Sequence, residues 1–286
     1  LLLNLHTMEP VERLWVTPRY RKLYAWYLAP EIQPKAIILM VHGHGEHSKR
    51  YLNWAERFTA NGYAFLAWDH FGHGLSDGKR GHINHYEQFM LEIDLAITKA
   101  SEYFPTVPII LYGHSMGGNI VLNHAIRRCC RANGIIVTSP WLRLSIPISP
   151  FVDFFVSVLG FITPFITIRS KVLPSEISHI DEEVEKYKYD PLIHNKISPR
   201  LYLAIRNAGL YAVKYAKRIK TPVLIMHGEE DEITDFNTSK EIAEKIEGCA
   251  FVPWPNMYHE LHNETVRGLV FETILKWLEL WIVKSK

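Results

Sequence analysis

The 286-residue chain contains 48% hydrophobic and 22% charged residues, a composition typical of a globular protein with a substantial core. Its formal net charge of +2 gives no sign of a polybasic surface, so we expect no nucleic-acid partner. The three cysteines, two of them adjacent (Cys129 and Cys130), do not form a disulfide framework, which favours a reducing, cytoplasmic location.

The start of the chain predicts a hairpin rather than a targeting signal. Residues 1–7 precede Met8 and lack the basic head, long apolar run and small-residue cleavage site of a secretory signal. Whether the natural chain begins at Met8 stays open. Residues 11–16 and 23–28 are rich in strand-forming residues and are separated by Pro18, which predicts an antiparallel hairpin at the edge of a sheet.

Strands and helices alternate along most of the chain. Amphipathic helices are expected at 50–60, 86–103, 119–127 and 265–283. Short apolar and β-branched runs predict buried strands at 35–41, 63–68, 107–112, 134–138, 222–226 and 250–254. This alternation predicts an α/β fold with a mostly parallel central sheet flanked by helices, in which chemistry belongs beyond the carboxyl ends of the strands.

The alternation lapses over residues 141–217. This stretch is too long for a loop, and we interpret it as a helical cap (lid) inserted within a single domain that spans residues 1–286. Its apolar run, 151–168, is at the short end for a membrane span and contains Asp153, Gly160 and Pro164. We therefore expect that it does not cross a membrane.

A strand, a tight turn and a helix meet around Ser115. Strand 107–112 runs into Gly113-His114-Ser115-Met116-Gly117-Gly118, and the helix follows, which is the context of a G-x-S-x-G nucleophile elbow. The glycines allow strand and helix to approach closely, and the helix N-terminus favours developing negative charge. A chance serine in a glycine-rich turn, or a phosphate-binding loop, is the alternative. The context favours Ser115 as the catalytic nucleophile.

A serine nucleophile needs a base, and the base needs an acid to orient it. In the fold that carries this elbow, the acid and then the base follow the serine along the chain. The predicted acid is Asp231, in the loop after strand 222–226, and the predicted base is His259, after strand 250–254. The competing residues are Glu229, Glu230 and Asp235 for the acid and His262 for the base.

The segment His42-Gly43-His44-Gly45-Glu46-His47, after strand 35–41, has two interpretations. In the first, the backbone N–H groups of His44 and Met116 form an oxyanion hole for the substrate. In the second, the segment resembles an H-x-H-x-[DE]-H zinc motif of a metallohydrolase, with further ligands from His70 and His73. The zinc interpretation leaves the serine elbow unexplained, so we expect neither a metal nor a cofactor.

Taken together, several segments resemble those of the monoacylglycerol lipase and lysophospholipase group of α/β-hydrolases. They are HGHGEHSKRY (42–51), DHFGHGLSDG (69–78), GHSMGG (113–118), YDPL (189–192), HGEED (227–231) and YHELHNE (258–264). The resemblance implies an α/β-hydrolase fold and cleavage of a small lipid ester, monoacylglycerol, through an acyl-enzyme. It further implies head-group contacts from Glu46, Arg50 and His262, and an apolar cap that makes peripheral contact with a membrane. Because bulky His44 replaces a small residue and the cap has no recognisable match, the alternatives are a lysophospholipase, a soluble carboxylesterase or a peptidase.

Overall fold

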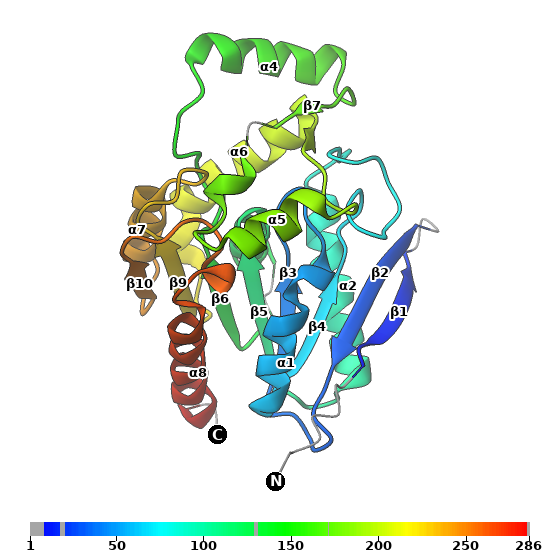
Figure 1. Cartoon of the computed structure of the whole chain (residues 1–286), viewed down its shortest axis with the longest axis vertical. Coiled ribbons are helices and arrows are strands. Elements are labelled where there is room, and N and C mark those ends of the chain that lie inside the picture. Colours follow the sequence, from blue (N-terminus) through cyan, green and yellow to red (C-terminus); the bar gives the residue numbers. More distant parts are fainter. Residues whose placement is uncertain (1–8, 18–20, 129–130, 171, 285–286) are drawn as a thin grey trace.

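A computed structural model describes residues 9–17, 21–128, 131–170 and 172–284. Met8 and the pair Cys129 and Cys130 lie outside the described residues. The core is an eight-stranded sheet with the order β1-β2-β4-β3-β5-β6-β9-β10 (Figure 1). Its strands are β1 (Val11–Val16), β2 (Lys22–Leu28), β3 (Ile37–Val41), β4 (Ala64–Trp68), β5 (Ile109–His114), β6 (Gly134–Thr138), β9 (Val223–Gly228) and β10 (Ala250–Trp254).

Strand pairing confirms the expected mostly parallel sheet with an antiparallel hairpin at its edge. The strands β4, β3, β5, β6, β9 and β10 run parallel, whereas β1 pairs antiparallel with β2, and β2 with β4. Two strands extend further than expected from the sequence, because the ladder continues through β5 to His114 and through β9 to Gly228. Ser115 therefore follows the last paired residue of β5 directly.

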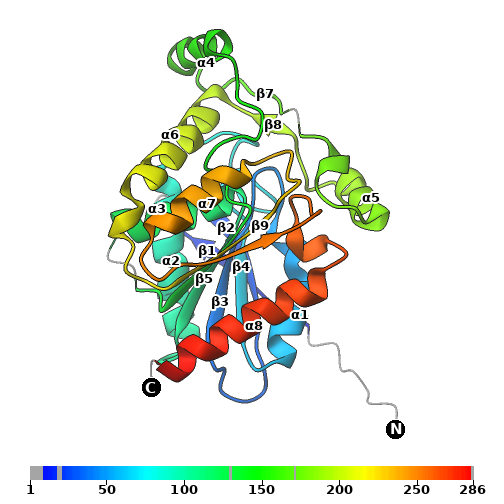
Figure 2. The same ribbon diagram turned by 90° about the vertical axis from the view of Figure 1, so that its left-hand side faces the viewer.

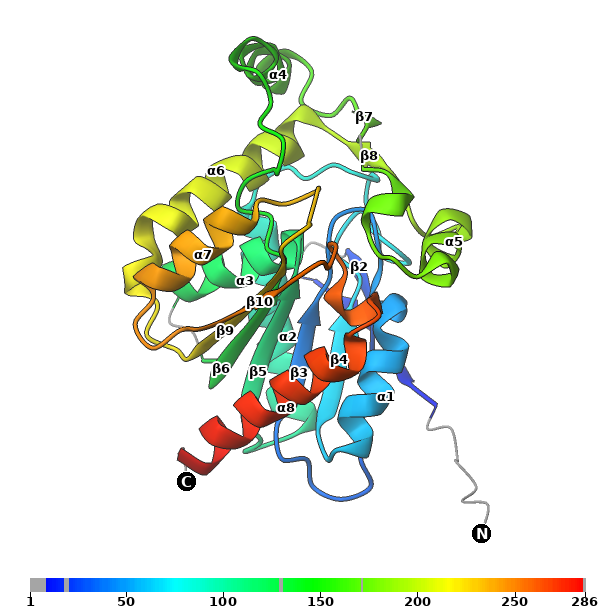
Figure 3. The ribbon, with the colours of Figure 1, turned by 60° about the vertical axis from the view of Figure 1, so that its left-hand side comes forward.

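Helices cover both faces of the sheet because successive side chains of the buried strands point to opposite faces. In β3, Ile37, Leu39 and Val41 belong to one core cluster, and Ile38 and Met40 to the other. The first cluster includes residues of α2 (Glu87–Tyr103), α3 (Met116–Arg127), α6 (Pro199–Tyr215) and α7 (Phe236–Lys245), and the second includes residues of α1 (Leu52–Ala60) and α8 (Arg267–Lys284). Figure 3 shows α1 and α8 together on one side of the sheet.

The segment between β6 and β9 lies beyond the carboxyl ends of the parallel strands (Figure 2). It contains α4 (Pro150–Ile162), α5 (Asp181–Tyr189) and α6 (Pro199–Tyr215), with the short ribbon β7 (Ile168–Arg169) and β8 (Lys196–Ile197). Ser149 and Ser198 cap α4 and α6 by accepting an N–H hydrogen bond in the first turn, and a proline follows each cap. No helix within the described ranges combines the length and apolar character required to cross a bilayer.

Candidate active site

The turn that carries Ser115 is strained and firmly held. Ser115 has φ 53° and ψ −117°, in a region that residues other than glycine rarely adopt. Its N–H donates to the carbonyl of Thr138 over 3.0 Å, and its carbonyl accepts from Asn119 and Trp141 over 3.1 and 2.9 Å. These bonds fix Ser115 between the end of β5 and the N-terminus of α3, where the helix dipole favours negative charge.

The glycines of the turn are required by close backbone contacts. A Cβ on Gly117 would overlap the backbone oxygen of Val41, and one on Gly113 would lie 2.5 Å from the backbone oxygen of Gly117. Backbone atoms of neighbouring elements cannot yield to a methyl group as a flexible side chain could. The G-x-S-x-G pattern therefore reflects the packing of α3 against β3 and β5.

The structure brings Asp231 and His259 together in the loops after β9 and β10. His259 Nδ1 and Asp231 Oδ2 form a hydrogen bond of 2.7 Å, and both side chains are buried. Asp231 also accepts from the N–H groups of Ile233 and Thr234, the hydroxyl of Thr234 and Nε2 of His227. Its carboxylate is therefore fixed on all sides, with His259 as one of its partners.

Burial and charge oppose one another in this pair. Burial raises the pKa of Asp231, but the neighbouring His259 and His227 outweigh it and hold the pKa of this carboxyl well below its usual range. Burial likewise lowers the pKa of His259, yet the Asp231 carboxylate more than compensates and raises it above the ordinary value of 6.5. The arrangement thus stabilises a positively charged imidazole that has received a proton at Nε2.

The competing acids and the competing base have other environments. Glu229 and Glu230 are exposed, and Asp235 caps α7 by accepting from the N–H of Thr238. The ring of His262 stacks on Tyr51 at 4.7 Å, and neither of its nitrogens has a hydrogen-bond partner. None of these side chains shares the hydrogen bond that joins Asp231 to His259.

His259 lies beside the nucleophile turn. Its ring centroid is 4.7 Å from that of His114, the residue before Ser115. The hydroxyl of Ser139, just after β6, donates to the backbone carbonyl of His259 over 2.8 Å. Since Nδ1 is engaged with Asp231, Nε2 is the ring atom that could accept a proton from a serine in this turn.

The loop after β3 passes close to Ser115. A Cβ on Gly43 would lie 3.2 Å from the Cβ of Ser115, and Met116 is the first residue of α3. The N–H of Gly43 donates to Oε1 of Glu46, and the carbonyl of Gly45 accepts from the N–H of His194 over 2.8 Å. The backbone around His44 is thus held at both ends, next to the serine.

Glu46 and Arg50 belong to a buried ion network that the sequence pattern did not predict. Arg50 binds Glu260 through two hydrogen bonds, of 2.6 and 2.7 Å, and binds Glu46 over 2.7 Å. Glu46 also accepts from the hydroxyl of Tyr51 over 2.8 Å. Burial raises the pKa of Glu260, but the Arg50 cation outweighs burial and lowers it to about 2. This network fixes the base of the loop that holds His44.

Other residues at the site also escaped the sequence analysis. Thr234 and His227 bind Asp231, and the ring of Tyr187 lies 4.9 Å from the Arg50 guanidinium carbon. His227 and Glu260 fall inside the segments quoted above for the family resemblance, so adjacency to the predicted acid and base was an available signal. Tyr187 and Thr234 carry no comparable local pattern.

The side chains of the zinc-like motif point to separate partners. The Nδ1 of His42 lies 2.8 Å from the carbonyl oxygen of Gly43, and its Nε2 accepts a hydrogen bond from the backbone N–H of His70 over 3.0 Å. The Nε2 of His47 lies 2.8 Å from the Oδ2 of Asp190. The carboxylate of Glu46 is engaged in the ion network. In the part of the chain that the structure describes, no three His, Cys, Asp or Glu side chains are arranged to hold a metal ion.

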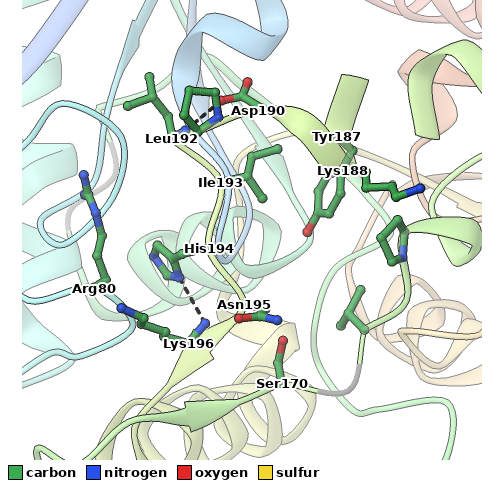
Figure 4. Close-up of a pocket in the computed structure, with 13 residues that line it drawn as sticks. Arg80, Ser170, Tyr187, Lys188, Asp190, Leu192, Ile193, His194, Asn195 and Lys196 are labelled. Carbon is green, nitrogen blue, oxygen red and sulfur yellow. Dashed lines mark hydrogen bonds between the residues drawn. The ribbon is translucent and has the colours of Figure 1, made fainter. Parts of the chain in front are cut away.

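A cavity of about 480 Å³ lies in the segment between β6 and β9 (Figure 4). Most of its lining comes from residues 187–196, with Arg80, Ser170 and two further residues of the segment between β6 and β9. The hydroxyls of Tyr187 and Ser170 point into it (Figure 4). Ser115, Asp231 and His259 do not line it. It is therefore a compartment separate from Ser115 and from the acid–base pair.

Comparison with known proteins places the chain among lipid ester hydrolases. A family model described as serine aminopeptidase, S33, matches residues 32–266. The chain is 30% identical over 252 residues to a monoacylglycerol lipase of Mycolicibacterium smegmatis (87% of this chain and 90% of that protein) and 31% identical over 272 residues to a monoglyceride lipase homolog of Monkeypox virus (91% and 94%). An abhydrolase domain-containing protein of Dictyostelium discoideum is 34% identical over 261 residues, and the chain spans 28% of its length.

Solved structures of other proteins show the same fold as this chain. The crystal structure of the Paleococcus ferrophilus monoacylglycerol lipase has a TM-score of 0.83 and 32% identity, over 91% of this chain and 99% of that one. A soluble variant of the Saccharomyces cerevisiae monoglyceride lipase has a TM-score of 0.84 and 20% identity, over 98% and 97%. Together with the sheet order, these likenesses confirm the predicted α/β-hydrolase fold.

Proposed function

Because this chain belongs to the serine aminopeptidase S33 family, and within it to the hydrolases related to monoacylglycerol lipases, we propose that it cleaves monoacylglycerol into fatty acid and glycerol. Ser115, His259 and Asp231 act as nucleophile, base and acid. The observation that carries this proposal is the buried hydrogen bond between Asp231 and His259, next to the strained turn of Ser115. A base oriented by a buried acid, beside a serine on a tight turn, supports covalent catalysis by that serine.

The reaction proceeds in two halves. His259 Nε2 takes the proton of the Ser115 hydroxyl as its oxygen attacks the acyl carbonyl, and Asp231 stabilises the resulting imidazolium. The N–H groups of His44 and Met116 bind the oxyanion, where one such donor typically contributes about 3 kcal/mol. The protonated His259 then releases glycerol. Water attacks the acyl-enzyme with the same base and frees the fatty acid and Ser115.

The glycerol head group is bound beside the buried ion network. Neither ring nitrogen of His262 has a protein partner, and burial lowers the pKa of His262 to about 4, so its ring is neutral at pH 7. A neutral imidazole offers one donor and one acceptor, which suits two adjacent hydroxyls. Glu46 accepts from the hydroxyl of Tyr51, on whose ring His262 stacks, so the ion network of Glu46 and Arg50 holds this side of the site in place.

The acyl chain is bound under residues 141–217, which act as a cap within a single domain. Each buried methylene of the chain contributes about 0.8 kcal/mol, which favours long acyl chains. The outermost helix of the cap, α4, contains no buried residue, and Phe151 and Phe161 are 70% and 89% exposed. Exposed apolar surface of this extent supports peripheral contact with a membrane by a cytoplasmic enzyme.

Labelling with a serine-directed fluorophosphonate tests the nucleophile. The wild type and a Ser101→Ala control, altered at an exposed serine of α2, should be labelled and should hydrolyse monoacylglycerol. Ser115→Ala should lose both properties. Retained activity in Ser115→Ala, or stoichiometric zinc with chelator-sensitive activity, would overturn the proposal.

A substrate panel separates the alternatives. Long-chain monoacylglycerol, lysophosphatidylcholine, a short soluble ester and an aminoacyl amide are compared by kcat/KM. The proposal predicts the highest value for monoacylglycerol. A higher value for lysophosphatidylcholine, the short ester or the amide would instead assign a lysophospholipase, carboxylesterase or peptidase.

A further inference from the structure

We propose that the end of the cap carries a cationic rim, formed by Lys79, Arg169, Lys196 and Arg200, that binds the anionic head groups of a lipid bilayer. The inference rests on the lipid substrate of the proposed function and adds the kind of membrane that the enzyme selects. Its occupant is a bilayer surface containing anionic lipid.

The apolar partner of this rim is α4, which packs in an unusual way. Its half-buried residues, Asp153, Val156, Ser157 and Gly160, follow helical spacing and form the side nearest α6, where Leu203 approaches Gly160. Asp153 forms an ion pair with Arg206 of α6, so the acidic group of α4 is neutralised. The large apolar side chains of α4 consequently face solvent, on a helix at the extreme end of the molecule (Figure 1).

The cations of the rim come from three separate segments that meet beside this helix. Ser198 donates its N–H to the carbonyl of Gly81 over 2.7 Å, which joins the loop containing Lys79 to the start of α6. The Nζ of Lys79 lies 5.5 Å from the ring centroid of Phe165, an exposed residue just after α4. Positive charge therefore lies at the edge of the exposed apolar surface.

Two of these cations face each other without a counter-ion. Arg169 of β7 and Lys196 of β8 are direct partners in the antiparallel ribbon, and both are exposed. Like charges at directly opposite positions destabilise a strand pair. Among the described residues, none of the four rim cations forms an ion pair, whereas Lys186, Lys188 and Arg206, elsewhere in the cap, do. Within the same described ranges, Lys214 and Lys217, at the C-terminal end of the cap, are also without an ion pair, but they do not lie beside α4. Two unpaired cations held opposite each other at the surface are therefore available to bind an anion from outside the protein.

The chemistry of a bilayer matches both features at once. Exposed phenylalanine and isoleucine enter the boundary between head groups and acyl chains, while arginine and lysine reach phosphate groups at its edge. Each basic side chain near an anionic membrane contributes about 1 kcal/mol, which corresponds to about fivefold in partition. Salt weakens this attraction because the Debye length is about 8 Å at physiological ionic strength.

Vesicle sedimentation tests the rim. Vesicles of phosphatidylcholine alone are compared with vesicles that also contain phosphatidylglycerol, for the wild type and Arg169→Gln/Lys196→Gln. The double variant should lose about 25-fold in partition to the anionic vesicles and keep its weak partition to the neutral ones. Its thermal midpoint should stay equal or rise, because a repulsive pair has been removed. High salt should lower wild-type binding to anionic vesicles.

Matched variants separate charge from apolar contact. Lys240→Gln/Lys276→Gln removes two exposed cations from α7 and α8, away from α4 and the rim, and should bind as the wild type does. Phe151→Ser/Phe161→Ser should weaken binding to both kinds of vesicle. All of these proteins should hydrolyse a short soluble ester equally well in the absence of vesicles. If the wild type does not hydrolyse this ester, the proposed function is refuted, whereas the rim is tested by the vesicle binding alone. Wild-type binding by Arg169→Gln/Lys196→Gln, or full competition by soluble glycerophosphate, would refute the rim.

Discussion

Replacing Arg50 by methionine tests the buried ion network that supports the site. The side chains of Arg50, Glu46 and Glu260 are only 9%, 4% and 3% exposed, so little water would reach the carboxylates that Arg50 leaves behind. Methionine keeps the apolar stem of arginine and removes its charge. The change breaks three short charge-assisted hydrogen bonds and leaves two buried acids without their cation.

The expected loss follows from the structure. Removing one partner of a buried ion pair typically costs about 3–5 kcal/mol. Tyr51 and Asn263 still donate to Glu46 and Glu260, which places this case near the lower end, at about 3 kcal/mol. A domain of ordinary stability has about 5–15 kcal/mol in total. Arg50→Met should therefore remain folded with a clearly lower urea midpoint.

The pKa of Glu260 predicts how the stability difference between the wild type and Arg50→Met changes with pH. In the wild type the pKa of Glu260 is depressed to about 2, so the stabilisation is present above its ordinary value of 4.5 and is lost as the pH falls from there toward 2. In Arg50→Met burial remains without the cation, so the folded pKa rises above the ordinary value. The variant then gains stability on acidification, and the difference between the two proteins should shrink from pH 8 to pH 5.

Urea unfolding at several pH values measures this effect, with Lys49→Met as the control. Lys49 is the residue before Arg50 and forms an ion pair with Glu12. Both of these side chains are exposed (41% and 55%), and such surface pairs contribute less than about 1 kcal/mol to stability. A loss in Arg50→Met no larger than in Lys49→Met would refute the network's role. A difference that grows on acidification would refute the electrostatic explanation.

Three further substitutions test the site itself. Asp231→Asn should lower kcat by about 10⁴-fold, as in trypsin-like triads, and shift the acid limb of kcat/KM to lower pH, because buried His259 loses the carboxylate that raises its pKa; an unmoved limb would contradict this. Gly117→Ala should destabilise the fold by at least about 2 kcal/mol in urea, since its Cβ overlaps the backbone of Val41, whereas Gly268→Ala meets nothing within 4 Å and should be neutral. His262→Phe should raise KM for monoacylglycerol while leaving kcat/KM for a short ester unchanged, and an equal loss on both would refute a head-group role.

The parts of this molecule that were predictable from sequence are those encoded locally. The buried strands are continuous apolar runs between turns, and the elbow depends on glycines two residues on either side of Ser115. Backbone overlap at Gly117 with β3 explains why that spacing is informative, since no other residue fits there. Asp231 and His259 could be predicted from the order of acid and base along the chain, because this fold places each of them after a particular strand.

Features made by residues far apart in the chain were not predictable in the same way. Arg50 and Glu260 are 210 positions apart, and only the packing of the loops after β3 and β10 brings them together. Arg169 and Lys196 become neighbours through a ribbon of two residues per strand, too short for a period to be read. The burial and the charged neighbours of these residues depend on contacts between distant segments, which the sequence of one segment does not reveal.

The histidine-rich loop after β3 illustrates the difference between a motif and a site. In an extended strand alternate residues point the same way, so His42, His44 and Glu46 would share one side if this segment were a strand. Here Gly45 has φ 79°, a left-handed conformation that turns the chain, so His44 faces the rings of His73 and His194 while Glu46 folds back on the N–H of Gly43. The same glycine holds His194 through its carbonyl and thereby fixes the backbone beside Ser115. The left-handed turn at Gly45 thus gives His44 and Glu46 separate partners, although the sequence pattern places them as neighbouring candidate ligands.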